Sequence, residues 1–209
     1  MKKLNAMFVV LTATAMIIGC AKPQEADIRP EDIKFTNIPA MIKKGAKWKY
    51  QYHSTGIPMQ QSIVCVSSQA EGRGKTSFIH HLTMTTIPVD MKMYWEIDAS
   101  GLRYIKSDAN KMITSYNPPL QILKFPVKVG DSWEQQVDVT SYKSGIAKVT
   151  RKVVSVENVT VKAGTFRCFK IHVKYEGPPE SDTYDDWWSE KVGFVKSTNK
   201  NNELTEFSE

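Results

Sequence analysis

Three cysteines are the side chains best suited to do chemistry in this 209-residue chain. Cys20 directly follows an apolar run, whereas Cys65 and Cys168 lie in predicted strands, within the sequences IVCV and FRCF. An even pair of cysteines in an oxidising compartment is typical of a disulfide, so the sequence predicts a Cys65–Cys168 bridge. Such a bridge would contribute about 4–5 kcal/mol in the chain-entropy model. The alternative is two buried free thiols that act as small hydrophobic side chains.

A second group of candidate residues lies near the C-terminal end, where carboxylates flank a pair of tryptophans. The tryptophans are Trp187 and Trp188, and the carboxylates are Asp182, Asp185, Asp186 and Glu190. Two carboxylates can serve as acid and base in glycoside hydrolysis, and tryptophan rings can stack on sugars. The pattern favours a simpler interpretation, an acidic loop that leads into a strand with one tryptophan inward. Trp187 and Trp188 are candidate contacts for a ligand or a partner.

No other motif predicts catalysis, a metal or a cofactor. His80 and His81 are adjacent in a predicted strand and point to opposite faces, so they cannot chelate one metal ion. The sequence contains neither a nucleophile elbow nor a complete phosphate-binding loop. The formal charge is +6, but basic residues do not alternate with aromatic ones, which argues against nucleic-acid binding. We therefore expect a protein that is not an enzyme and uses no cofactor.

The first twenty residues predict a location. Two lysines precede an apolar run at 4–18, which is too short to span a bilayer and is typical of a secretory leader. The sequence IIGC at 17–20 resembles the lipobox of bacterial lipoproteins. This resemblance implies cleavage before Cys20, acylation of that cysteine, for example with palmitate, and membrane attachment through its lipid. Ala21, in place of aspartate, implies the periplasmic route to a Gram-negative outer membrane. The alternative is an ordinary leader with an incidental cysteine.

These features divide the chain into three segments. We expect a signal peptide at residues 1–19, the lipidated cysteine and a tether at residues 20–40, and a single β-rich domain at residues 41–209. The tether is polar and contains three prolines, which is typical of a linker. Phe35 and Ile38 are apolar, which leaves open the alternative that part of this segment packs on the domain.

Beyond residue 47 the sequence alternates apolar and polar residues with almost no helical period. Gly-containing connections at 99–101 and 143–145 predict two hairpins. The predicted fold class is mainly β, with a curved antiparallel sheet that forms a half-barrel or open barrel and with little helix. Pro118 and Pro119 are expected in a loop or at an edge, because proline cannot donate within a ladder. Trp133 is expected to be an inward anchor next to a turn at Gly130.

Three segments carry a resemblance to a known group of proteins. They are FPVKVGDSWE at 125–134, VKAGTF at 161–166 and WWSEKVGFVK at 187–196. Together they resemble a loose group of uncharacterised bacterial secreted proteins and lipoproteins with VGDxW, AGTF and VGxVK motifs. The resemblance implies an open antiparallel sheet similar to the half-barrel of lipoprotein carriers, and it implies no catalytic residues.

Two functions are compatible with these observations. The first is a lipid-anchored, non-enzymatic binding or scaffold module that contacts another envelope protein, for which the exposed edges of an open sheet would offer places to add a strand. The alternative is a carrier that holds a lipid or another apolar ligand in the concavity of the sheet. The aromatic and methionine content favours the carrier.

Overall fold

The structure, a computed structural model, describes residues 35–54, 57–85, 88–199 and 204–208. Cys20, the leader and most of the predicted tether lie outside these residues. The described part forms one short helix and twelve strands: α1(Pro39–Ile42), β1(Lys47–Ser54), β2(Ile57–Gly72), β3(Lys75–Met84), β4(Asp90–Asp98), β5(Gly101–Ala109), β6(Met112–Lys124), β7(Ser132–Thr140), β8(Gly145–Val161), β9(Gly164–Glu176), β10(Asp182–Ser189), β11(Gly193–Asn199) and β12(Leu204–Phe207).

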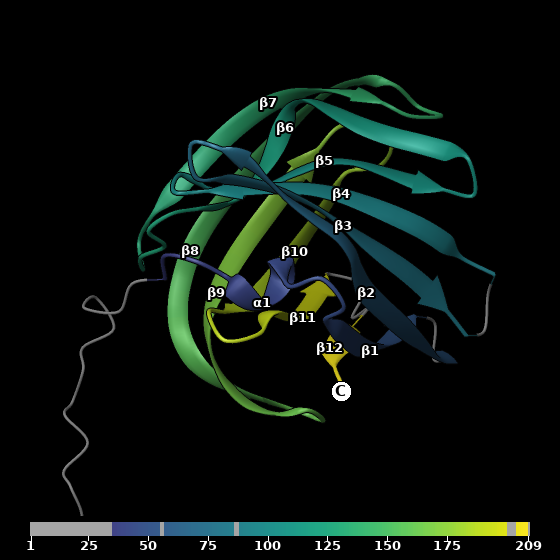
Figure 1. The fold of residues 1–209 in the computed structure, drawn as a ribbon. Helices are drawn as coiled ribbons and strands as arrows, with labels where there is room; N and C mark the ends of the chain where they lie inside the picture. The colour runs from purple at the N-terminus through teal and green to yellow at the C-terminus, as the bar shows by residue number, and fades with distance from the viewer. Residues whose placement is uncertain (1–34, 55–56, 86–87, 200–203, 209) are drawn as a thin grey trace, which may run out of the picture.

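The strands form a single antiparallel barrel in which each strand pairs with its neighbours in the chain (Figure 1). The strand β12 pairs with β1, from Tyr50 opposite Phe207 to His53 opposite Leu204, and this pairing closes the sheet. The expectation of a mainly β, curved antiparallel sheet with little helix is confirmed. The sheet goes further than a half-barrel, because every described strand has two neighbours, although β6 and β7 pair over only three residues.

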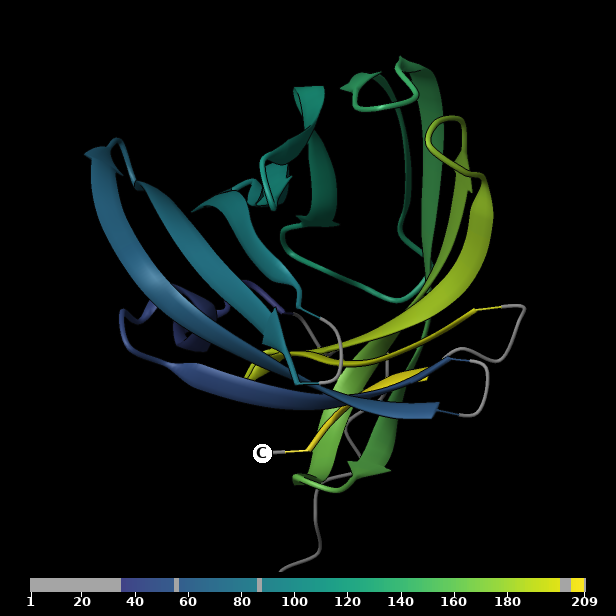
Figure 2. The same cartoon turned by 90° about the vertical axis from the view of Figure 1, so that its right-hand side faces the viewer.

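Strict alternation of side chains explains why the sequence folds into this barrel. In β8, Ala147, Val149 and Val153 are buried, whereas Lys148 and Lys152 between them are exposed. Successive side chains of a strand point to opposite faces, so the apolar set lines the interior. Figure 2 shows β8 and β9 as long curved strands that sweep along one side of the molecule.

The two prolines of β6 occupy a place where the ladder is interrupted. Tyr104 pairs with Leu120 and Lys106 pairs with Ser115, so the residues between these β6 partners bulge away from β5. On its other side, β6 pairs with β7 only from Ser115 to Asn117. The expectation of a loop or an edge at Pro118 and Pro119 was wrong. A bulge inside a strand also leaves residues outside the ladder, so proline there does not need to donate a backbone hydrogen bond.

The turn before β7 was predicted more accurately than the anchor that follows it. Gly130 has a φ of +91°, which favours glycine. Trp133 packs against the core and donates from Nε1 to the carbonyl oxygen of Gln121 at 3.2 Å, but it is only half-buried. Trp133 thus faces the core as expected, without being fully buried.

The segment before β1 belongs to the core. Phe35 forms a bridge with Val127, and both Phe35 and Ile38 are buried. Met41 of α1 is also buried, and a Cβ added at Gly193 would lie 2.8 Å from its Cγ. The predicted tether at 20–40 is therefore too long at its C-terminal end, because residues 35–40 pack on the barrel. Among the described residues, no helix has the length and apolar character needed to cross a membrane.

Candidate functional site

A cavity of about 240 Å³ lies inside the barrel. An engineered cavity of about 150 Å³ binds benzene, so this one has room for roughly ten non-hydrogen atoms. Its walls come from α1 and from strands on both sides of the β1–β12 closure, and they are mostly aromatic or aliphatic. The apolar lining residues are Met41, Trp48, Tyr50, Ile63, Met93, Trp95, Ile122, Trp188, Val192 and Phe194, and the polar ones are His80, Arg151, Tyr184 and Asp186.

Aromatic rings in contact form a large part of the wall. The Trp95 ring centroid lies 4.5 Å from that of Tyr104, and the His80 centroid lies 5.2 Å from that of Trp48. On the neighbouring strands β10 and β11, Trp188 meets Phe194 edge to face at 5.4 Å. Offset and edge-to-face pairs of this kind are favourable beyond the area that they bury. The wall is therefore a packed aromatic surface suited to an apolar ligand.

Two opposite charges project into this apolar space. Arg151 of β8 and Asp186 of β10 are buried, with 2% and 7% of their surface exposed. The Nη1 atom of Arg151 lies 4.0 Å from Oδ2 of Asp186, which is an ion pair at the limit of contact. Burial raises the pKa of Asp186 to about 6, although the charge of Arg151 opposes the rise. A buried pair without close hydrogen bonding is costly to maintain, so its presence calls for an explanation.

Some polar atoms of the wall have partners. The Trp48 indole donates to the carbonyl oxygen of Val192 at 3.2 Å, and the Tyr50 hydroxyl donates to that of Phe194 at 3.1 Å. The Nε2 atom of His80 lies 2.8 Å from the carbonyl oxygen of Met41 and donates to it in the neutral ring. Burial lowers the pKa of His80 to about 4, so the ring is neutral at neutral pH. The hydrogen bonds of these groups are therefore made within the protein and need no ligand.

Other polar atoms of the wall lack partners. Within the described part of the chain, Nε1 of Trp95, Nε1 of Trp188, and Nε and Nη1 of Arg151 are buried and have no hydrogen-bond partner. Most buried donors in proteins are satisfied, and an unsatisfied one costs about 1–3 kcal/mol. All four atoms are N–H donors, and all belong to residues that line the cavity. The cavity is therefore short of hydrogen-bond acceptors.

The structure separates the two tryptophans predicted as a contact site. A bulge between Trp187 and Trp188 interrupts the pairing of β10 with β11. Trp188 lines the cavity, whereas the Trp187 indole donates to Glu157 and has the ammonium groups of Lys170 and Lys196 over its ring at 5.0 and 5.2 Å. Side chains of this chain thus cover Trp187, and only Trp188 is placed to contact a ligand in the cavity.

The neighbouring carboxylates separate in the same way. Asp185 faces away from the cavity and accepts from His172 at 2.7 Å, with the Lys170 ammonium at 3.0 Å. Only Asp186 reaches the interior. The acid–base pair considered from the sequence is therefore not assembled.

The predicted Cys65–Cys168 disulfide is absent. Both thiols are free and fully buried within the described residues, and each bonds to a carbonyl oxygen of its own strand. Cys65 lies on β2 and Cys168 on β9, which are not neighbours in the barrel. The alternative of two small hydrophobic side chains is the one observed.

Arg151 is the residue that the sequence interpretation missed, although a signal exists. It occupies the position between Val149 and Val153 in the inward-facing series of β8. A charged residue at an apolar position of an alternating strand is unusual, because buried charges require partners. The same test singles out Asp186, whose neighbours on its face are Tyr184 and Trp188.

A second arginine cluster lies on the other face of the sheet. Trp95 and Tyr104 contact each other on the inner face, so their chain neighbours Glu96 and Arg103, which are also paired, face outward. Arg103 donates to Glu96, to both oxygens of Asp98 and to the Ser100 hydroxyl. Burial alone would raise the pKa of Asp98, but hydrogen bonds from Arg103 and Ser100 outweigh burial and hold that pKa well below its usual range.

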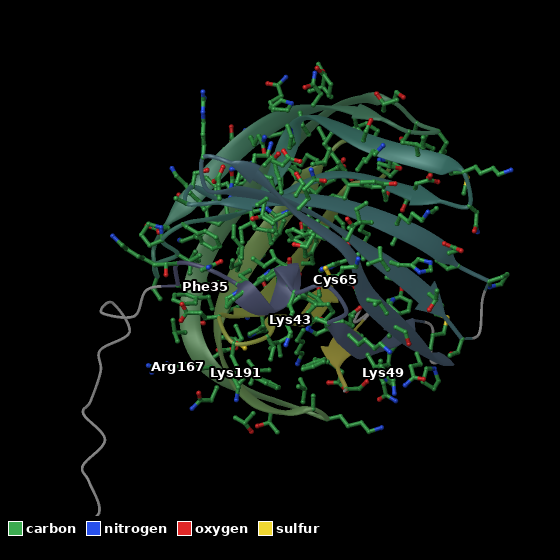
Figure 3. All side chains as sticks on the ribbon, in the orientation of Figure 1. Phe35, Lys43, Lys49, Cys65, Arg167 and Lys191 are labelled. Carbon is green, nitrogen blue, oxygen red and sulfur yellow. The ribbon has the colours of Figure 1, made fainter. Side chains whose placement is uncertain are left out.

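A surface groove lies near the start of the described chain. It is lined by Phe35, Phe166, Arg167, Lys191 and neighbouring residues. Figure 3 shows Arg167 and Lys191 close to each other, on the same side of the molecule as Phe35. The groove contains no buried unpaired polar atom among the described residues, which distinguishes it from the cavity inside the barrel.

Comparison with known proteins finds one family model and two solved structures that are similar to this chain. A DUF3108-like family model matches residues 121–209, the part that contains the three motifs. An exported protein with a YmcC-like fold from Bacteroides fragilis NCTC 9343 is 14% identical, covers 84% of this chain and 97% of its own, and has a TM-score of 0.53. A lipoprotein from Parabacteroides distasonis ATCC 8503 is 14% identical, with coverages of 85% and 99% and a TM-score of 0.49. No curated protein matches the sequence significantly. The first structure shows a shared β-barrel fold.

Proposed function

We propose that this protein is an exported lipoprotein whose barrel binds an apolar ligand in its central cavity. The observation that carries the proposal is the aromatic-lined cavity of about 240 Å³ inside a closed barrel. Ligand sites are typically concave and mostly apolar, with a few polar groups that orient the ligand. The cavity has this composition, and its unsatisfied donors are groups that a ligand would complete.

The closed sheet favours this carrier function over the scaffold module. The scaffold hypothesis depended on free strand edges to which a partner could add. The pairing of β12 with β1 occupies the two terminal edges of the sheet in the described chain, whereas β6 and β7 pair over only three residues. Contact with another envelope protein stays a prediction.

The anchor at Cys20 is part of the proposal and rests on the lipobox resemblance alone. Acylation at this position would hold the barrel at a membrane, with the outer membrane favoured by Ala21. We expect Cys20→Ala to abolish lipid attachment, as measured by membrane fractionation and by the mass of the mature chain. Mature-sized protein that stays fully in the outer-membrane fraction would contradict the lipoprotein assignment.

Ligand binding can be tested with the Cys20→Ala chain prepared without detergent, since detergent would compete for the cavity. We expect octan-1-ol to bind with one site per barrel by isothermal titration calorimetry. We also expect Ile63→Trp, which fills the cavity from β2, to abolish binding. Val66→Trp on the same strand is the matched control, because Val66 is exposed and the added ring lies outside. Absence of binding, or equal binding by the Ile63→Trp variant, would overturn the proposed function.

A further inference from the structure

We infer that the ligand is a single-chain amphiphile with a carboxylate head, and that Arg151 binds this head inside the barrel. The inference rests on the proposed function and specifies its ligand. Three observations lead to it: the kind of polar atom left unpaired, the charge balance of the cavity, and its size.

The unpaired atoms specify acceptors on the ligand. Arg151, Trp95 and Trp188 come from three different strands, line one cavity and together leave four buried N–H donors unsatisfied in the described chain. A ligand that brought donors, such as an amine, would leave these groups unpaired. Arginine recognises oxyanions with charge-assisted hydrogen bonds, so either free donor of Arg151, Nε or Nη1, can bind an oxygen of a carboxylate.

The charge balance favours a single negative charge. Asp186 already opposes Arg151, so a carboxylate ligand makes the cavity negative by one unless a proton is taken up. Asp186 is the group placed to take up this proton, because burial has already raised its pKa to about 6. A phosphate monoester carries a charge of about −1.5 to −2 at neutral pH, which one arginine and one added proton do not balance.

The remaining volume suits a medium-length alkyl chain. The cavity has room for roughly ten non-hydrogen atoms, and its wall beyond Arg151 and Asp186 is aromatic and aliphatic. Octanoate matches both the size and the head group. Octan-1-ol keeps the chain with a neutral head, and octylammonium keeps the chain with a positive head.

The test measures the affinities of these three probes for the Cys20→Ala chain by calorimetry. We expect octanoate to bind more tightly than octan-1-ol, and octylammonium to bind most weakly. We expect Arg151→Met to weaken octanoate binding by roughly 10- to 100-fold, the effect of losing hydrogen bonds to a charged group, and to weaken octan-1-ol binding by a smaller factor. Lys152→Met is the matched control, since Lys152 is the next residue of β8 and is exposed.

The outcomes separate the inference from the proposed function. Equal binding of octanoate and octan-1-ol, or a preference for octanoate that survives Arg151→Met, overturns the carboxylate assignment and leaves the apolar cavity standing. Failure of every probe overturns both. If Arg151→Met does not fold, the double variant Arg151→Met with Asp186→Asn removes both charges together, and it too must lose the preference for octanoate.

Discussion

Arg103 and Arg151 are both placed beside carboxylates on the same barrel, yet their surroundings differ. Arg103 makes hydrogen bonds to Glu96, Asp98 and Ser100, and Lys75 adds a second cation at Glu96. Arg151 is more deeply buried and leaves two donor atoms without partners in the described chain. A cluster whose hydrogen bonds are made within the protein stabilises the fold, whereas buried donors without partners lower the stability of the protein. The comparison indicates that Arg103 stabilises the barrel and that Arg151 is available to a ligand.

The largest expected effect is on the stability that Arg103 and its partners on the outer face of the sheet provide. Arg103→Met should lower the free energy of unfolding by about 3 kcal/mol, because Glu96 and Asp98 lose their partner while partly buried. Urea denaturation measures the loss, and Lys106→Met on the same strand should cost less than about 1 kcal/mol. Octanoate affinity should not change. A stable Arg103→Met variant with impaired binding would reverse the roles that we assign to the two arginines.

The stability that the carboxylates around Arg103 contribute and the stability that Asp186 contributes should change with pH in opposite directions. The pKa values of Glu96 and Asp98 lie below their usual values, so their stabilisation is present at neutral pH and is lost as pH falls through those pKa values. The pKa of Asp186 is raised from 3.8 to about 6, so its contribution is present below pH 3.8 and is lost as pH rises through about 6.

The effect of Asp186 is measured as the free energy of unfolding of the parent chain minus that of the Asp186→Asn variant. This difference should fall by about 2 kcal/mol between pH 4 and pH 7. His80, whose pKa is lowered, contributes with the opposite sign, but it is present in both chains and cancels. A difference that rises with pH would show that Asp186 is stabilised as a carboxylate, contrary to our description of the cavity.

The strand pattern predicted much of this fold, and the reason is that alternation is a local property. The inward series Ala147, Val149 and Val153 of β8 is visible in the sequence, as is the glycine turn at Gly130. Closure was not predictable in the same way. It depends on four residues of β12 that pair with β1 from the opposite end of the chain, and no local pattern reports that pairing.

The site was predicted only in part for a similar reason. Trp188 was a candidate, and Arg151 could have been one from its position in β8. The sequence could not predict that two donors of Arg151 lack partners, because Arg151 and Asp186 lie on strands that are separated by β9. The cysteines show the same limit: each lies in a strand as expected, but β2 and β9 do not pair, so the expected disulfide does not form.

A smaller effect distinguishes proton uptake at Asp186 from simple attraction to Arg151. Octane-1-sulfonate keeps one negative charge at all relevant pH values, so any pH dependence of its affinity reports the protein. Its affinity should be constant below about pH 6 and should fall by up to about ten-fold per pH unit above it, because binding then requires a proton.

The groups that face Asp186 limit what else could titrate in this experiment. They are Arg151 from β8, Tyr184, Asp185 and Trp188 from its own strand, and Ser197 from β11, while His80 from β3 also lines the cavity. The pKa of Tyr184 is raised by burial, that of Asp185 is lowered and that of His80 is about 4, so none of these titrates between pH 6 and pH 8. Asp186→Asn should abolish the pH dependence, and its persistence in that variant would exclude Asp186 as the proton acceptor.

The smallest effect concerns one unpaired donor of the cavity wall, the indole N–H group of Trp188. Trp188→Phe keeps an aromatic ring on the wall and removes one unpaired N–H group. Octanoate affinity should fall by roughly five-fold, the effect of one ordinary hydrogen bond, and octan-1-ol affinity should fall less. Trp187→Phe is the matched control, since that indole donates to Glu157 outside the cavity. Loss of both ligands to the same extent would show that Trp188 contributes only its ring.

The central claim is tested most directly by a crystal structure of the Cys20→Ala chain with octanoate bound. We expect the carboxylate within hydrogen-bonding distance of Nε or Nη1 of Arg151, with the alkyl chain against Trp95 and Trp188. Octanoate with its head turned away from Arg151, or bound only outside the barrel, would contradict the account.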